Sequence, residues 1–145
     1  MKRETQKPFS QSFSIVGKEF FDAGKVSTEI KSMLKELGVE AGIIRRIAIA
    51  MYEAEMNVVM YATDATVTLE LTPKAIRIVI DDRGPGIPDV ELAMQEGYST
   101  ATPEMREMGF GAGMGLPNIK KNADHFRIES VVGKGTRLEI CVNIN

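Results

Sequence analysis

The chain has 145 residues, of which 43% are hydrophobic, and a formal net charge of −2 at pH 7. This length predicts a single compact domain with a core of its own and is too short for two. The charge argues against the basic surface typical of nucleic-acid binding, the lone Cys141 excludes an internal disulfide, and no Cys/His grouping has metal-ligand spacing.

The first half of the chain predicts a short strand followed by two helices. Residues 1–11 are polar and expected to be disordered, so the folded domain is expected to span residues 12–145, with an opening strand at residues 13–16. Apolar residues at helical spacing predict a helix over residues 20–37 and a second over residues 40–62. The apolar stripe of the second helix is Ile43, Ile47, Met51, Ala54 and Val58.

Alternating residues then predict two β-hairpins. The first joins residues 67–71 to residues 76–80, and the second joins residues 126–132 to residues 136–144 around the turn Gly133–Gly135. No signal peptide is recognisable and no apolar segment is long enough to span a membrane, so we expect a cytoplasmic protein.

Strand phase distinguishes two neighbouring aspartates. Side chains alternate along a strand, so Asp82 continues the inward face that includes Ile80, whereas Asp81 points away from it. A carboxylate at the edge of a core is costly unless a group donates to it. Asp82 either caps the turn that contains Gly84 and Gly86, or accepts a hydrogen bond from an exocyclic amine such as adenine N6 while the glycines let the backbone approach a flat ring.

Helix phase separates two glutamates in the same way. Glu53 and Asn57 lie one turn apart on one flank of the apolar stripe, so their side chains meet. Glu55 falls on the opposite flank, where we expect it to be exposed or at an interface. An amide oxygen suits Mg²⁺ and a carboxylate suits proton transfer, although an ordinary polar helix border would carry the same pair.

The second glycine-rich segment, Gly109–Leu116, leads into a short predicted helix. Pro117 fits the first turn of that helix, where its missing N–H costs nothing. A helix N-terminus after flexible glycines is a ready anion site, to which Lys120 or Lys121 would add positive charge unless both belong to a solvated face. The segment is neither a Walker loop nor a Rossmann fingerprint, because GxxxxGK[ST] is absent and no strand precedes it.

In chain order, the motifs are E-x-x-x-N on a helix, D-x-G-x-G-I after a strand, G-x-G-x-G before a helix, and Gly135-Thr136 at the start of the last strand. This order resembles the GHKL (Bergerat-fold) ATP-binding superfamily over nearly the whole chain. The segments Glu91–Thr100 and Gly113–Pro117 are most similar to the bacterial anti-sigma factor and switch-protein serine/threonine kinases. The fold implied is an α/β (α+β) two-layer sandwich, with helices on one face of a mixed, mostly antiparallel sheet.

The resemblance implies a role for each matching residue. Asp82 would bind the adenine amine, Asn57 would contact the nucleotide and ligate Mg²⁺, and Glu53 would be the catalytic base. Thr136 would join the hydrogen-bond network around Asp82, and residues 88–112 would form an ATP lid. The other expected nucleotide contacts are Gly84, Gly86, Ile87, Gly111, Gly113, Met114, Gly115, Leu116 and Lys120.

The function implied is that of an anti-sigma regulatory factor that uses ATP and Mg²⁺ to phosphorylate a serine or threonine of a small STAS-domain partner. The alternative is a non-catalytic module that sequesters a partner, such as a sigma factor, according to its ATP state. A detached histidine-kinase catalytic domain is less favoured, because no upstream helix with a phospho-accepting histidine is seen and His125 is in the wrong place. The family resemblance also implies a homodimer, with no direct contact to nucleic acid or membrane.

Overall fold

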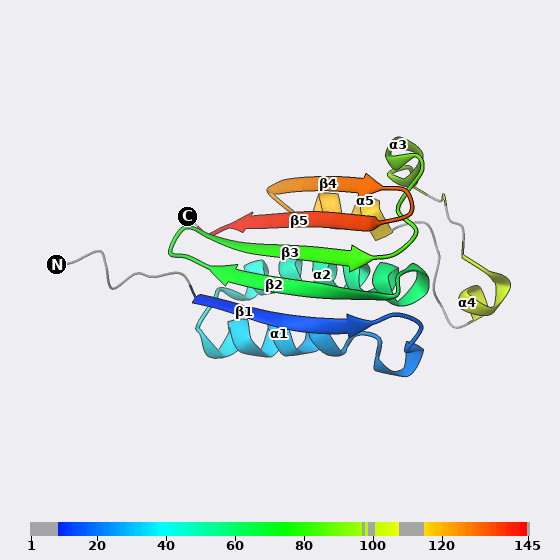
Figure 1. Cartoon of the computed structure of the whole chain (residues 1–145). Coiled ribbons are helices and arrows are strands. Elements are labelled where there is room, and N and C mark those ends of the chain that lie inside the picture. Colours follow the sequence, from blue (N-terminus) through cyan, green and yellow to red (C-terminus); the bar gives the residue numbers. More distant parts are fainter. Residues whose placement is uncertain (1–8, 97, 99–100, 108–114, 145) are drawn as a thin grey trace.

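The protein was analysed as a computed structural model, which describes residues 9–96, 98, 101–107 and 115–144. It has two layers, a five-stranded sheet and a layer of helices that covers one face of the sheet (Figure 1). The strands are β1 (Phe9–Val16), β2 (Asp64–Leu71), β3 (Ala75–Arg83), β4 (His125–Val131) and β5 (Gly135–Asn143). The helices are α1 (Lys25–Glu36), α2 (Ala41–Tyr61), α3 (Val90–Ala93), α4 (Pro103–Glu107) and α5 (Gly115–Lys121), with a 3-10 turn at Phe20–Asp22.

The core lies between the inward face of the sheet and helices α1, α2 and α5. Alternation along the strands places one apolar set on this face, so that Ile78 lies in register between Leu69 on β2 and Ile140 on β5. All three side chains have 0% of their surface exposed. The two-layer sandwich expected from the motif order is therefore confirmed.

The sheet is antiparallel throughout rather than mixed. Its strand order is β1-β2-β3-β5-β4, and each of the four neighbouring pairs is antiparallel. After β3 the chain passes through α3, α4 and α5 and re-enters the sheet at its edge as β4, then returns as β5 between β4 and β3. Strands β3 and β4 do run parallel, but β5 separates them, so the crossover creates no parallel pair.

The sheet also begins earlier than the alternation of side chains predicts. Strand β1 starts at Phe9, which pairs with Leu71, so the expectation that residues 1–11 are disordered is wrong for residues 9–11. The backbone of β1 pairs with β2 whether or not its side chains are apolar, and Ser10 and Gln11 are exposed. Residues 1–8 fall outside the described residues.

Helix α2 is the element against which both α1 and α5 pack. It begins where the Glu40 side chain accepts hydrogen bonds from the backbone N–H groups of Gly42 and Ile43. It packs against α1, α5 and the sheet, and its Met51 and Ala54 are fully buried. None of the described helices is long and apolar enough to cross a membrane.

Glu55 on α2 is buried, contrary to the exposed or interfacial position expected from helix phase. Only 1% of its surface is exposed, and its carboxylate accepts hydrogen bonds from Val26 N at 3.1 Å and Ser27 N at 2.8 Å in the first turn of α1. The N-cap residue of α1 is Gly24, which has a φ of 96° and no side chain with which to cap the helix. Glu55 supplies that cap from α2, and a negative charge there also complements the helix dipole.

We expect Glu55→Ala to destabilise the protein by about 1–3 kcal/mol, because two buried N–H groups would lose their acceptor. Glu55→Gln should cost less, since its amide oxygen can still accept one hydrogen bond. Urea unfolding monitored by circular dichroism measures both variants. Glu29→Ala is the control, because Glu29 is exposed on α1 and its loss should change stability by under about 0.5 kcal/mol. Equal stability of Glu55→Ala and Glu29→Ala would contradict the capping role.

Candidate functional site

Asp82 lies near the end of β3 on the inward face, half-buried, while Asp81 is exposed on the other face. The Asp82 Oδ1 atom accepts a hydrogen bond from the backbone N–H of Thr136 at 3.0 Å. No described residue donates to Oδ2. One oxygen of this carboxylate is therefore held by the adjacent strand, and the other has no donor among the described residues.

The electrostatics of Asp82 favour such a donor. Burial raises the pKa of Asp82 above its usual value, the Thr136 N–H opposes that rise, and the nearby Asp81 carboxylate adds to it. A partly desolvated carboxylate gains from any further hydrogen bond to its charged form. An amine positioned at Oδ2 would supply one.

The backbone of β5 approaches Asp82 closely at Gly135. This residue has a φ of +148°, and a Cβ placed on it would lie 2.0 Å from the carbonyl oxygen of Asp82. No larger residue fits there without moving β3 away from β5. Gly84 lies beside the same carboxylate, whereas Gly86 packs against the backbone of Val131 in the β4–β5 turn region.

Ser130 links the two predicted contact residues Thr136 and Ile87. Its Oγ lies 2.8 Å from the Thr136 Oγ1 and accepts a hydrogen bond from the Ile87 backbone N–H at 2.7 Å. Thr136 thus contacts Asp82 through its backbone and Ser130 through its side chain. We did not identify Ser130 from the sequence, although its position opposite Thr136 across the hairpin is the signal that would have found it.

Glu53 and Asn57 form a second polar group with the N-terminal turn of α5. A Cβ on Gly115 would lie 3.3 Å from Asn57 Oδ1 and 3.7 Å from Glu53 Oε1, so the first residue of α5 lies beside both side chains. Asn118 Nδ2 donates a hydrogen bond to Glu53 Oε2 at 3.3 Å. No motif in the sequence singles out Asn118, which lies one turn after Gly115 and therefore on the same side of α5.

The remaining predicted contacts occupy different surroundings. The Leu116 side chain is 7% exposed and belongs to the core, so only its backbone can face a ligand. Ile87 packs partly against the core. Lys120 is exposed in the last turn of α5, and no hydrogen bond or ion pair within the described part of the chain joins its side chain to another predicted site residue. Gly111, Gly113 and Met114 lie outside the described residues, as does part of the predicted lid.

Helix α2 connects the polar group around Asp82, which includes Thr136 and Ser130, with the second polar group of Glu53, Asn57 and Asn118. It carries Glu53 and Asn57, and it ends at Ala62, whose Cα would lie 3.0 Å from a Cβ on Gly84. The nine-residue interval from Glu53 to Ala62 corresponds to about 13 Å of helix. Both groups therefore lie along the last turns of one helix.

Residues able to hold a metal are few in this region. Among the described residues, no three His, Cys, Asp or Glu side chains gather as a metal site. Asn57 Oδ1 is a hard neutral oxygen beside the Glu53 carboxylate, and Gly115 places no side chain between them and the ligand space. This donor set fits a Mg²⁺ ion that takes most of its other ligands from phosphates and water.

Known proteins similar to this chain include a serine/threonine-protein kinase and anti-sigma F factors. The chain is 34% identical over 113 residues to the serine/threonine-protein kinase RsbT of Bacillus subtilis, an alignment that covers 75% of this chain and 79% of RsbT. It is 35% identical over 98 residues to the anti-sigma F factor of Caldanaerobacter subterraneus, covering 64% of this chain and 65% of that protein. The chain thus spans slightly less than two thirds of that second relative.

Solved structures share the fold. A crystal structure of the RsbU and RsbW domains of Rv1364c from Mycobacterium tuberculosis superposes with a TM-score of 0.60 at 21% identity, covering 91% of this chain and 32% of that one. Residues 22–142 match the family described as "Histidine kinase-like ATPase domain". That match includes both polar groups described above. The chain belongs to the histidine kinase-like ATPase domain family, within the GHKL superfamily.

Proposed function

We propose that the protein is an ATP-dependent serine/threonine protein kinase that phosphorylates a small STAS-domain partner. The observation that supports this most directly is the Glu53 carboxylate, which Asn118 orients beside Asn57 at the first turn of α5. A binding site for nucleotide alone has no need of a base in that position. The likeness to RsbT, which is named as a kinase, supports the same proposal.

The nucleotide would lie along the end of α2, between the two polar groups. Asp82 Oδ2 would accept a hydrogen bond from the adenine amine, while Thr136 and Ser130 hold that end of the site. Asn57 would hold Mg²⁺ together with phosphate oxygens, and backbone groups of the glycine-rich segment before α5 would contact the phosphates. Bound ATP and Mg²⁺ would supply the transferable γ-phosphoryl group and neutralise its charge.

Glu53 would handle the proton of the acceptor. The acceptor hydroxyl oxygen forms a bond to the γ-phosphorus, the bond from that phosphorus to the ADP oxygen breaks, and the hydroxyl proton passes to the Glu53 carboxylate. Asn118 is a positioning residue, because it fixes one carboxylate oxygen and leaves the other to face the acceptor.

A second candidate is a regulator that sequesters a sigma factor or a STAS-domain protein according to its nucleotide state, with little turnover. The likeness to anti-sigma F factors favours it. The two functions share the nucleotide site and differ in whether Glu53 is needed. A cytoplasmic homodimer is part of both proposals.

Replacing Asp82 tests the adenine assignment. In Asp82→Asn the amide oxygen can still accept a hydrogen bond from Thr136 N. The amide nitrogen is a donor and would face the adenine amine, which is also a donor. ATP affinity should therefore fall about 10- to 150-fold, the equivalent of about 1.5–3 kcal/mol. Guanine carries an acceptor oxygen where adenine carries the amine, so the preference for ATP over GTP should shrink as well. Calorimetric titration with each nucleotide measures both effects.

The thermal unfolding of the ligand-free Asp82→Asn variant serves as its control. Removal of a desolvated charge should leave the midpoint unchanged or raised, so a weakened affinity will not reflect misfolding. ATP binding as tight as in the wild type would show that Asp82 does not contact adenine.

Replacing Glu53 separates transfer from binding. Glu53→Gln keeps an oxygen that can accept from Asn118 but removes the base, so ATP affinity should stay within about twofold while phosphate transfer to a STAS-domain protein falls roughly 10²- to 10⁴-fold. Labelled ATP and mapping of the phosphorylated residue measure transfer. Glu129→Gln makes the same chemical change on the open face of the sheet and should leave transfer unaltered. Undiminished transfer by Glu53→Gln would remove Glu53 from the mechanism, whereas negligible transfer by the wild type itself would favour sequestration.

A further inference from the structure

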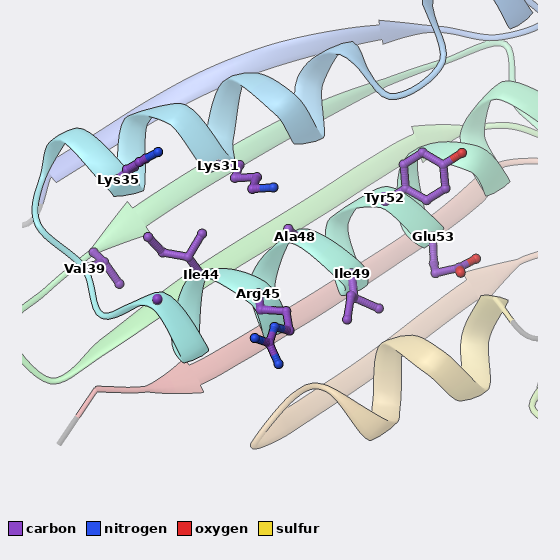
Figure 2. Close-up of a pocket in the computed structure, with 10 residues that line it drawn as sticks. Lys31, Lys35, Val39, Ile44, Arg45, Ala48, Ile49, Tyr52 and Glu53 are labelled. Atoms are coloured by element: carbon purple, nitrogen blue, oxygen red, sulfur yellow. The ribbon is translucent and has the colours of Figure 1, made fainter.

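A groove runs between α1 and α2 on the helical side of the molecule, away from the sheet (Figure 2). It has a volume of about 610 Å³. Lys31 and Lys35 come from α1, Arg45 and Ile49 come from α2, and Glu53 lies at the end nearest α5. The groove therefore ends at the residue proposed as the catalytic base.

The charge of this groove differs from that of the whole chain. Lys31, Lys35 and Arg45 are exposed, and none of them forms an ion pair with another described residue. The chain as a whole carries a net charge of −2. Three cations that no described residue pairs, gathered beside one concave surface, give a local positive potential that would attract an acidic ligand.

Apolar side chains lie between these cations and Glu53. Ile49 is 38% exposed and Tyr52 is 47% exposed, and Ala48 lines the groove between α1 and the Ile49 side chain. Exposed aliphatic and tyrosine side chains of this kind are typical of sites where proteins meet. A ligand that matches the groove therefore needs both acidic and apolar groups.

The dimensions favour a helix as the occupant. From Ala41 to Glu53 the groove follows α2 for twelve residues, or about 18 Å, which is the length of about three helical turns. An amphipathic helix laid in such a groove can present an apolar stripe to Ile49 and Tyr52 and carboxylates to the lysines. An acidic membrane is a weaker match, because a flat surface cannot enter a concave groove and offers no acceptor at Glu53.

We propose that an acidic amphipathic helix of the phospho-acceptor protein docks between α1 and α2, and that this contact presents the acceptor hydroxyl to Glu53. The inference rests on the proposed kinase function, since a general base must come within hydrogen-bond reach of the proton that it removes. Docking along α2 would bring the acceptor hydroxyl to Glu53, where it must also reach the γ-phosphate.

The test is the charge-reversed double variant Lys31→Glu/Lys35→Glu, assayed with a purified STAS-domain protein. Its KM for that protein should rise at least about tenfold, with kcat at saturation and the Kd for ATP both within about twofold of wild type. Lys74→Glu/Arg127→Glu is the matched control, because it changes the charge equally at exposed positions in the β2–β3 turn and on β4. The control should leave all three constants unchanged.

Direct binding distinguishes failure of the groove from failure of the kinase function. Calorimetry of the ATP-bound proteins with the same STAS-domain protein needs no turnover. Weaker binding by the double variant supports the groove even if the wild type transfers no phosphate, in which case the kinase proposal alone fails. Unchanged binding and unchanged KM in the double variant overturn the groove while leaving the kinase proposal intact.

Two further results decide between partners. Replacing acidic residues of the partner helix by lysine should restore binding to the double variant, as expected for direct charge pairing. Vesicles containing phosphatidylglycerol provide the membrane comparison. If the double substitution abolishes vesicle binding and leaves the STAS-domain protein bound as before, the groove is a membrane contact and the docking proposal is wrong.

Discussion

The packing of α2 against the sheet is the interaction on which the rest of the molecule depends. Met51 and Ala54 bury one side of the helix completely, and this fixes the direction in which every other α2 side chain points. Glu53 and Asn57 then lie at the margin facing α5, and Glu55 lies at the margin facing α1. Glu53 is the proposed catalytic carboxylate, and Glu55, two residues later, is the structural one. The helical repeat alone directs their side chains to different sides of α2.

The opposite end of the site depends on backbone approach rather than on side-chain packing. Strands β3 and β5 come so close at Asp82 and Gly135 that a Thr136 N–H reaches the Asp82 carboxylate. That contact holds one carboxylate oxygen and stabilises its charge, while burial destabilises it. The balance leaves an acceptor that is fixed in place and that the described residues satisfy only in part, as the proposed recognition of one amine donor requires.

Periodicity predicted the positions that depend on strand or helix phase, and it failed where contacts cross between elements. The inward position of Asp82 comes from the strand repeat, and the placing of Glu53 and Asn57 on one flank of α2, both beside Gly115, comes from the helix repeat. Burial of Glu55 could not be inferred in this way, because it depends on a contact with another helix. The N-terminus of α1 packs beside α2 and has no side-chain cap of its own. Asn118 and Ser130 were missed for the same reason, since each acts on a residue from another part of the chain. The early start of β1 was missed because backbone pairing leaves no side-chain pattern.

The Glu55 cap has a consequence for the groove between α1 and α2. Two hydrogen bonds from the start of α1 to one α2 side chain join the helices near the end of the groove where Glu53 lies. The two walls are therefore anchored to each other near the point where the proposed docking would place the acceptor. A partner would meet a groove of fixed width there. The conformational entropy of these two helices would already have been lost when the protein folded, so binding would not have to order them.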